Sequence, residues 1–265
     1  GNGVLISGAE SELKKLAEYL QIPVVMSGMG KGAISTRHDL SVGASGVFGW
    51  GCANKTLDEA DVVVSIGFRF GEFSYAQMFS IKPKWKLIHI DIDPDEIGRA
   101  FPVEVGIIGD AKKVLNQFLQ AAESRNAKSK FADTHWFNRF HEFKEEWLLE
   151  LDAKCKNDSK NISPYRLVRE MREILPEDTI LFVDCGNNQG WGMHVFDSYL
   201  PGTFHMPGGY GHLGWSFPAA MGGKLAAPDR IVVSITGDGG FHYSFHELAT
   251  AAQENIPVII VVFND

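Results

Sequence analysis

The fold of this chain is decided by the stretch from Ile231 to Asp265, which reads IVVSITGDGGFHYSFHELATAAQENIPVIIVVFND. An apolar, β-branched run from Ile231 to Thr236 stops at a glycine-rich turn, and a second such run spans Val258 to Phe263. Apolar residues at helical spacing lie between the runs, and Ser244 with Glu247 fits a capping box at the start of one helix. The pattern predicts a strand, a helix and a strand, whose right-handed crossover leaves the two strands parallel.

An acidic residue follows each of these strands, Asp238 after the first and Asp265 after the second. If the strands are neighbours, their carboxyl ends lie about 4.8 Å apart, so two carboxylates meet at one edge of the sheet. Open parallel sheets bind ligands at that edge, and Mg²⁺ prefers one or two carboxylates with phosphate oxygens and water. Gly239 and Gly240 let backbone N–H groups approach an anion because they lack a Cβ. These residues predict a metal-bridged diphosphate site.

Two further segments bring similar chemistry to the same region. A strand predicted over 179–183 ends in the polar segment Asp184 to Gln189, which adds a third strand end with glycine and amide side chains. The loop from Pro207 to Trp215 is dense in glycine, and such a loop lets a flat ring approach the backbone. Taken alone, that loop also fits an ordinary helix-entry turn with a packed leucine.

The segment Gly237-Asp238-Gly239, followed after 24 residues by Asn264-Asp265, resembles the cofactor motif of thiamine diphosphate-dependent enzymes. Within that group the acetolactate synthase-like branch is the best match, and the resemblance covers essentially the whole chain. It implies thiamine diphosphate and Mg²⁺ as cofactors, with Asp238 and Asp265 as the metal ligands. The family often has asparagine where this chain has Asp265, so the site carries an extra negative charge.

The resemblance also assigns contacts to the cofactor. Leu213 takes the place of the bulky apolar residue that props the cofactor in its bent form, and the Gly211 carbonyl would accept from the 4′-amino group. Asn188 stands where the family often has a histidine, so a neutral amide would replace that diphosphate contact. The residues implied to bind the cofactor are Gly186, Asn187, Asn188, Gly211, His212, Leu213, Gly237, Asp238, Gly239, Gly240 and Asp265.

The implied reaction is decarboxylation or carboligation of a 2-oxo acid, or of an aldehyde, by an acetolactate synthase-like transferase or lyase. Benzaldehyde lyase-like and oxalyl-CoA decarboxylase-like chemistry stay open, as does a non-catalytic nucleotide-binding or scaffold fragment. The family's activating glutamate belongs to a pyrimidine-binding domain of a partner subunit, and no residue here takes that role. We therefore expect a fragment of a homodimeric or homotetrameric enzyme, with a domain before Gly1 and more chain after Asp265.

The first half of the chain predicts another α/β domain. Strands are predicted at 23–26, 61–66, 86–90 and 103–108, and helical patterns separate them, as in a doubly wound parallel sheet. We expect a central Rossmann-like domain over 1–125, a helical linker over 126–160, and a diphosphate-binding domain over 161–265 that is truncated at its C-terminus. An aromatic stripe from Trp136 to Trp147 predicts core packing or a subunit contact for the linker helix.

Nucleotide and metal sites in this first half are disfavoured. Gly1-Asn2-Gly3 is an incomplete dinucleotide fingerprint and is better interpreted as a tight turn. Gly71-Glu72-Phe73 departs from the acidic RFDDRVTG-like pattern of the FAD-binding synthases, which favours a structural role over FAD. His89, Asp91 and Asp93 share one face of a strand, but Asp93-Pro94 fits a helix N-cap better than a metal site, and Asp110 is a second predicted N-cap.

Composition limits the partners. A net charge of −8 and an isoelectric point near 5.6 argue against nucleic acid or an acidic membrane as a partner. The three cysteines, Cys52, Cys155 and Cys185, are too scattered for a disulfide framework or a zinc site, and they fit the reducing cytoplasm. No apolar window approaches the length of a membrane span.

Overall fold

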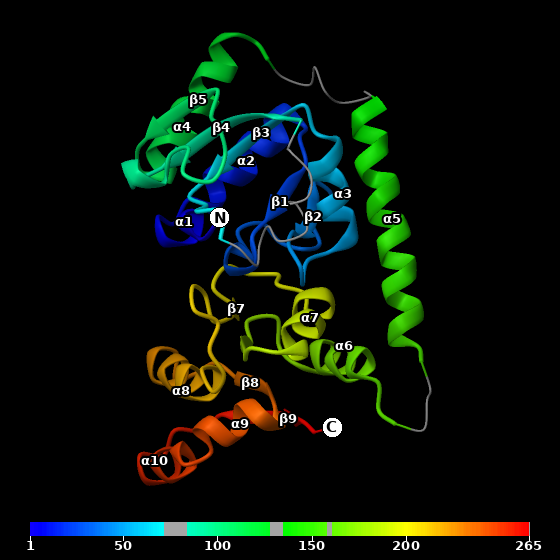
Figure 1. Cartoon of the computed structure of the whole chain (residues 1–265), viewed down its shortest axis with the longest axis vertical. Helices are drawn as coiled ribbons and strands as arrows, with labels where there is room; N and C mark the ends of the chain where they lie inside the picture. Colours follow the sequence, from blue (N-terminus) through cyan, green and yellow to red (C-terminus); the bar gives the residue numbers. More distant parts are fainter. Residues whose placement is uncertain (72–83, 128–134, 158–160, 265) are drawn as a thin grey trace. The chain divides into compact units, whose positions relative to one another are not determined.

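The structure, a computed structural model, describes residues 1–71, 84–127, 135–157 and 161–264. Packing divides the chain into two compact units, Gly1–Leu149 and Glu150–Asp265, whose elements are labelled in Figure 1. Both units are built from helices and parallel strands, so the expected α/β class with parallel sheets is confirmed. The finer division at 125 and 160, with a separate linker, stays a prediction.

Five helices and five strands of the first unit lie in the described ranges. The helices are α1 (Asn2–Ile6), α2 (Glu10–Leu20), α3 (Gly51–Glu59), α4 (Ala111–Ser124) and α5 (His135–Cys155), the last of which continues into the second unit. The strands are β1 (Val24–Met26), β2 (Ser41–Ala44), β3 (Val62–Ile66), β4 (Lys86–Asp91) and β5 (Val105–Ile108), with short 3₁₀ turns at Gly28–Gly30 and Pro94–Glu96.

All strand pairs of this unit are parallel, with β1 paired to β2 and with β3, β4 and β5 in that order in a second sheet. The four predicted strands are confirmed to within two residues. The sequence prediction missed β2, because its SVGA stretch is rich in small residues and carries little β-propensity although all four residues are buried.

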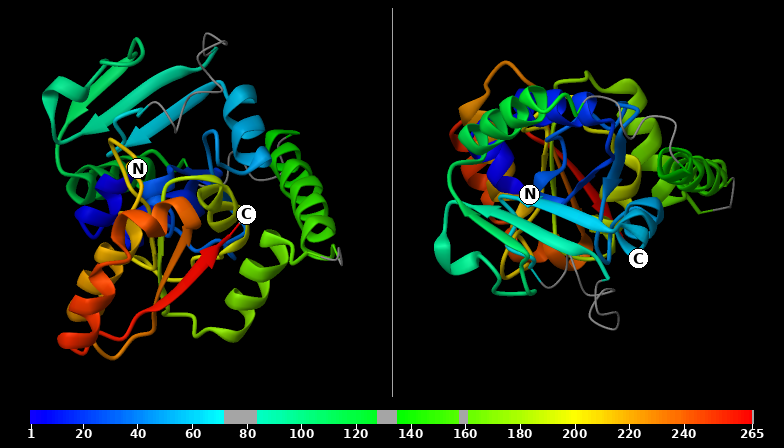
Figure 2. Two further views of the ribbon diagram at one scale, coloured as in Figure 1. Left: turned by 60° about the horizontal axis from the view of Figure 1, so that its bottom comes forward. Right: turned by 90° about the horizontal axis from the view of Figure 1, so that it is seen from above.

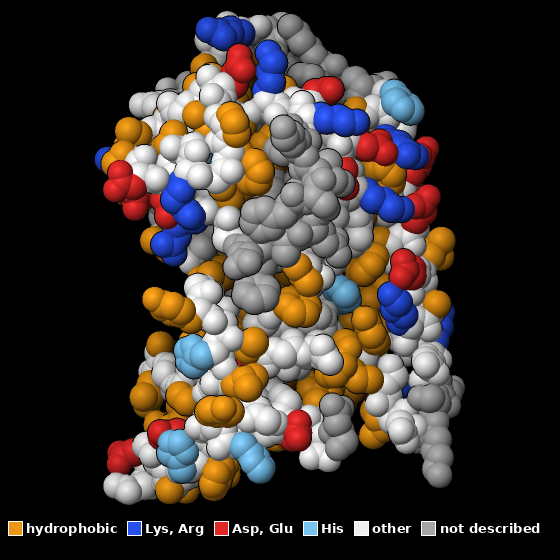
Figure 3. All heavy atoms as spheres, in the orientation of Figure 1, with side chains coloured by type: hydrophobic (Ala, Val, Ile, Leu, Met, Phe, Trp, Pro, Cys, Tyr) orange, Lys and Arg blue, Asp and Glu red, His pale blue; other side chains and the backbone are white. Residues whose placement is uncertain are grey.

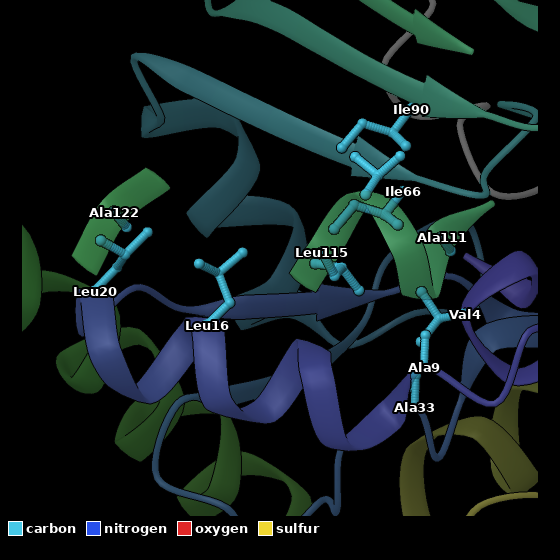
Figure 4. Close-up of a cluster of buried hydrophobic side chains, with 11 residues drawn as sticks. Val4, Ala9, Leu16, Leu20, Ala33, Ile66, Ile90, Ala111, Leu115 and Ala122 are labelled. Atoms are coloured by element: carbon cyan, nitrogen blue, oxygen red, sulfur yellow. The ribbon is translucent and has the colours of Figure 1, made fainter. Parts of the chain in front are cut away.

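The core of the first unit lies where α2 and α4 pack beside the β3–β4–β5 sheet, as Figure 4 shows. Leu16 and Leu20 project from α2 toward α4, where Leu20 faces Ala122. Leu115 of α4 lies in the same cluster, near Ile66 and Ile90 of the strands. Leucines at helical spacing in both helices thus form the apolar faces that the sequence predicts. Their burial contributes roughly 1.5–3 kcal/mol per leucine to stability.

A cavity of about 590 Å³ separates the two sheets of the first unit. Consecutive residues line it, Val24–Met26 of β1 and Val62–Ile66 of β3. Because side chains alternate between the faces of a strand, consecutive residues at a cavity mean that the strand edges border it. The Gly67 N–H donates to Ile90 of β4, whereas the Ile66 carbonyl accepts from the amino group of Gly1, so alternate residues of β3 turn away from β4.

We predict that the amides of Val62 and Val64 exchange with solvent roughly fivefold or more faster than those of Val63 and Ser65, since a hydrogen bond is worth about 1 kcal/mol. Val63 and Ser65 direct their N–H groups toward β4, as the register of the β3–β4 pair requires, and Val62 and Val64 direct theirs away from it. Residue-resolved hydrogen exchange by NMR measures the difference. Equal protection of the four amides would contradict this assignment of the β3 edge.

Two acidic residues of the first unit, Asp93 and Asp110, act at helix starts. Asp93 accepts from the Asp95 N–H at 3.0 Å, and Asp110 accepts from the Lys113 N–H at 3.1 Å, so both predicted N-caps are confirmed.

His89, another residue considered for a metal site, contacts backbone groups instead: its ring lies against the Phe68 carbonyl and the Gly98 N–H. Among the described side chains, no three His, Cys, Asp or Glu groups come close enough to hold a metal ion. Glu72 and Phe73, on which the expectation about FAD depends, lie outside the described residues.

The aromatic stripe of α5 packs into the first unit, which confirms the core-packing interpretation. Phe140 and Phe143 are buried, and the Trp147 ring stacks on Trp50 with 6.3 Å between centroids. Opposite charges border this helix, including the Arg139–Glu59 and Lys55–Glu146 pairs, and Figure 3 shows acidic and basic side chains interspersed along it. No helix in the described ranges is long and apolar enough to cross a membrane.

The second unit contains one parallel sheet. Its strands are β6 (Ile180–Val183), β7 (Phe204–His205), β8 (Val232–Gly237) and β9 (Ile259–Phe263), in the order β7-β6-β8-β9. Its helices are α6 (Pro164–Ile174), α7 (Asn187–Val195), α8 (Ser216–Ala226), α9 (Asp238–Ser244) and α10 (Glu247–Gln253). Figure 2 shows β8 in orange beside β9 in red.

The predicted single helix between β8 and β9 is wrong. Ser244 ends α9 and is buried, so it does not cap α10, whose N-cap position is His246. The first helix instead begins at Asp238, directly after the strand. This early start matters for the site because it turns the glycine-rich segment into the first turn of a helix.

Candidate functional site

Three polar segments meet at one edge of the second sheet. β8 pairs in parallel with both β6 and β9, with Val183 opposite Ile235 and Gly237 opposite Phe263. The carboxyl ends of the three strands are therefore neighbours, as the sequence predicts. Asp238 follows β8 and Asn264 follows β9 at this edge, while the predicted partner Asp265 lies outside the described residues.

A small hollow of about 180 Å³ opens at this edge, and we call it the strand-end hollow. It is lined by Cys185, Gly186, Asn187, Asn188, Trp191, Leu213, Gly237, Asp238, Gly239, Gly240 and Phe263. Eight of these residues are among the predicted site residues. Gly211 and His212 are also predicted, but they do not line the hollow, and His212 is exposed to solvent.

The β8 end of the hollow offers an accessible carboxylate beside open backbone. Asp238 is the exposed first residue of α9. A Cβ built on Gly239 would meet no atom of the described residues within 4 Å, so these residues leave the space above this backbone open. A cation at the carboxylate and an anionic group above the glycine are the ligands that such a surface accepts.

The β6 end supplies a helix start and an amide. Gly186 precedes α7 with a φ of 120°, and no side chain caps the helix. Helix N-termini attract anions because their first N–H groups lack partners. Asn188 is buried in this turn, where its Nδ2 donates to the Asp184 carbonyl at 2.6 Å. This bond fixes the amide in the turn that borders the hollow.

The glycine-dense loop brings one apolar side chain to the hollow. Gly209, Gly211 and Gly214 all have positive φ, which explains the glycines at these positions. Leu213 lines the hollow and is 40% exposed. An exposed leucine that lines a hollow does not fill the core and leaves an apolar surface open to a ligand.

Asp184 ties these segments together. Its carboxylate is fully buried and accepts four hydrogen bonds, from the N–H groups of Cys185, Gly214 and Trp215 and from the hydroxyl of Thr236, at 2.8–3.2 Å. From the sequence, Asp184 is expected at a strand end, but no role for it follows from the sequence. A buried carboxylate requires such partners, and the only signal in the sequence is an acid directly after an all-apolar strand.

Two aromatic residues of the hollow were also missed. Trp191 from α7 and Phe263 at the end of β9 have ring centroids 4.9 Å apart, and both line the hollow. Trp191 lies four residues after Asn187, so helical spacing brings both to one side of α7. That spacing is the signal by which the sequence could have indicated Trp191.

The chain matches two domain models of one known family. Residues 1–118 match the thiamine pyrophosphate enzyme central domain, and residues 184–265 match the thiamine pyrophosphate enzyme C-terminal TPP binding domain. The chain belongs to the thiamine pyrophosphate enzymes. The strand-end hollow, with Asp184 beneath it, lies within the TPP binding domain of this family.

Several relatives of this thiamine pyrophosphate enzyme are acetolactate synthase large subunits. A probable one from Methanocaldococcus jannaschii is 41% identical over the whole chain, which covers 45% of that protein. The acetolactate synthase isozyme 3 large subunit of Escherichia coli K12 is 31% identical, and the chain covers 46% of it. The acetolactate synthase large subunit of Corynebacterium glutamicum is 33% identical, and the chain covers 42% of it. The chain therefore spans a little less than half the length of the curated relatives it matches.

The residues of the hollow fit the diphosphate end of the family's cofactor. The uncapped start of α7 and the open backbone at Gly239 suit an anion, and the exposed Asp238 suits a divalent cation. Leu213 adds an apolar side chain to the lining of the hollow. Among the described residues, the donor set is thus one carboxylate with backbone groups, and such a set suits Mg²⁺ together with phosphate oxygens.

The two glycines of α9 should respond differently to substitution. A Cβ on Gly240 would lie 2.5 Å from both Asp184 Oδ2 and Thr236 Oγ1, so we predict that Gly240→Ala loses about 1–3 kcal/mol of unfolding free energy through overpacking. Gly239→Ala is the matched control and should stay within about 0.5 kcal/mol, because the position is open. Urea denaturation measures both, and equal effects would contradict the close packing of Gly240 on Asp184.

Cys185 should react slowly in this enzyme. Burial raises the pKa of its thiol, and the charge of Asp184 raises it further. Because the thiolate is the nucleophile, we expect alkylation by iodoacetamide to be slow at neutral pH and to keep rising above about pH 8.5, the ordinary pKa. Peptide mass spectrometry follows the modification, with the urea-unfolded chain as the control. A rate that levels off near pH 7 would contradict this prediction.

Proposed function

We propose that this chain contributes the central and diphosphate-binding parts of an enzyme that decarboxylates and ligates 2-oxo acids, with thiamine diphosphate and Mg²⁺ as cofactors. The observation that carries the proposal is the strand-end hollow, where a carboxylate, an uncapped helix start and an apolar side chain from separate segments border one space. The names of the relatives favour acetolactate synthase-like chemistry within this class.

The proposal gives each wall of the hollow a task. Asp238, with Asp265, would hold Mg²⁺ beside the diphosphate, while Gly239, Gly240 and the start of α7 would offer backbone N–H groups to the phosphate oxygens. Leu213 would give the cofactor an apolar contact. Gly211 lies in the same loop, although outside the hollow, and its carbonyl would still accept from the 4′-amino group of the cofactor. His212, beside it, stays a proposed cofactor-binding residue. When bound, the cofactor supplies the carbanion-stabilising chemistry, and these residues orient it.

The aromatic pair of Trp191 and Phe263 gains a role in the same proposal. Its rings form part of the wall between the β6 and β9 ends. Apolar surface here limits access of water to the phosphate and metal, and electrostatic interactions strengthen when water is excluded. Asn188 would complete the diphosphate contact with the amide hydrogen that the Asp184 carbonyl leaves available.

Parts of the reaction are assigned outside this chain. The activating glutamate would come from a pyrimidine-binding domain of a partner subunit in a homodimer or homotetramer. The chain alone should therefore bind cofactor weakly and turn over poorly. We also propose that the first unit serves a structural purpose without FAD, and that the enzyme works in the cytoplasm, where the free thiols Cys52, Cys155 and Cys185 would stay reduced.

We predict that Asp238→Ala weakens Mg²⁺-dependent binding of thiamine diphosphate roughly a hundredfold, because loss of even an outer metal contact costs 10- to 100-fold. Isothermal titration calorimetry with and without Mg²⁺, with cofactor up to the millimolar range, measures the affinity. The exposed Asp229 precedes β8 on the opposite edge of the sheet, so Asp229→Ala is a matched control with unchanged binding. Binding that is equally tight without Mg²⁺, or no binding by the unaltered chain, would favour a scaffold function instead.

A further inference from the structure

Asp184 lies next to the strand-end hollow but does not line it, so a contact with the cofactor gives no reason for this residue. It follows β6 directly, its side chain is fully buried, and it is absent from the lining of the strand-end hollow. Its four donors come from its own turn, from the loop before α8 and from the end of β8. One carboxylate therefore links all the segments from which the walls of the hollow are built, except β9.

The link to the loop acts next to Leu213. Asp184 Oδ2 accepts from the Gly214 N–H at 2.9 Å, and Oδ1 accepts from the Trp215 N–H at 3.2 Å. The Gly214 N–H belongs to the peptide unit that starts at the Leu213 carbonyl, so this bond fixes the orientation of the backbone that carries Leu213. Gly214 also has a φ of 80°, and a Cβ there would lie 2.6 Å from Tyr243 of α9.

The link to β8 acts next to Asp238. Asp184 Oδ2 accepts from the Thr236 hydroxyl at 2.8 Å, two residues before the proposed metal ligand. The same oxygen would lie 2.5 Å from a Cβ at Gly240, so the first turn of α9 rests directly on the carboxylate. A single oxygen atom therefore contacts the segments that carry Leu213 and Asp238.

We propose that Asp184 is a positioning residue, which holds the Leu213 loop at a fixed distance from the Asp238 turn so that both reach one cofactor molecule. The inference rests on the proposed function. It predicts a loss of cofactor affinity that exceeds any general loss of stability, because a loosened loop must be ordered again on binding. Asp184 itself touches neither cofactor nor substrate in this proposal.

The test compares two nearly isosteric variants. In Asp184→Asn, the amide keeps one acceptor oxygen, and its NH₂ group must face donors. If that group replaces Oδ2, the Thr236 hydroxyl can rotate to accept from it, whereas the Gly214 N–H can only donate and loses its partner. Thr236→Val removes the hydroxyl but leaves both loop N–H groups bonded to the carboxylate and Gly240 of the Asp238 turn packed on Oδ2, so the loop and the turn stay linked. Only the first variant therefore releases the Leu213 loop.

Binding of thiamine diphosphate with Mg²⁺ is measured by calorimetry for the unaltered chain and both variants, well below their unfolding temperatures. We expect Asp184→Asn to bind at least about tenfold more weakly, as an unsatisfied buried donor implies, and Thr236→Val to stay within about threefold. The amides of Gly214 and Trp215 should exchange faster only in Asp184→Asn. If that variant does not give the native circular dichroism spectrum, Asp184→Glu, which shifts the carboxylate by one methylene group, takes its place with the same expected loss.

The outcomes separate the two proposals. If the unaltered chain binds and Asp184→Asn binds equally well, the positioning role is wrong while the proposed function stands. If both variants lose affinity equally, Asp184 acts through general stability and the positioning role is again wrong. If the unaltered chain shows no Mg²⁺-dependent binding, the proposed function fails and the inference that rests on it fails with it.

Discussion

The parallel register of β6, β8 and β9 is the constraint on which the site depends. Each strand is short and leads into a polar segment, and each pair is aligned so that these segments begin at the same edge. In an antiparallel sheet, neighbouring strands would end at opposite edges and the same residues would be separated by the length of a strand. Parallel pairing is itself a result of the crossover connections, since β6 and β8 are each followed by helical segments that return the chain to the other edge.

Asp184 shows how a buried charge shapes such an edge. Removing a carboxylate from water is costly unless hydrogen bonds replace the lost hydration, and this one accepts four. Three of the four donors are backbone N–H groups, which lie in a turn and a loop outside the regular hydrogen bonding of helices and strands. The hydrogen bonds that replace the hydration of the carboxylate are thus the same bonds that fix the turn and the loop in place. Gly240 completes the arrangement, because any larger residue would push α9 away from the carboxylate.

Local patterns predict most strands of this chain because apolar β-branched runs bounded by glycine, proline or acids need little tertiary context. They fail for β2, whose small residues become a strand through burial, and for the two-residue β7. They also fail between β8 and β9, where Ser244 and Glu247 fit a capping box by spacing alone. There the packing of Gly240 against Asp184 starts a helix at Asp238, and tertiary contact overrides the local signal.

The sequence alone determined the chemistry of the site, because the motif Gly237-Asp238-Gly239 and the glycine-dense loop state which groups are present and how far apart they are along the chain. It also identified eight of the residues that line the hollow. Only the tertiary structure decided that Gly211 and His212 lie outside the hollow, that Trp191 and Phe263 belong to it, and that Asp184 joins its walls. These facts depend on which segments approach across the sheet edge, and residues as distant as 184 and 236 meet only when the strands have paired.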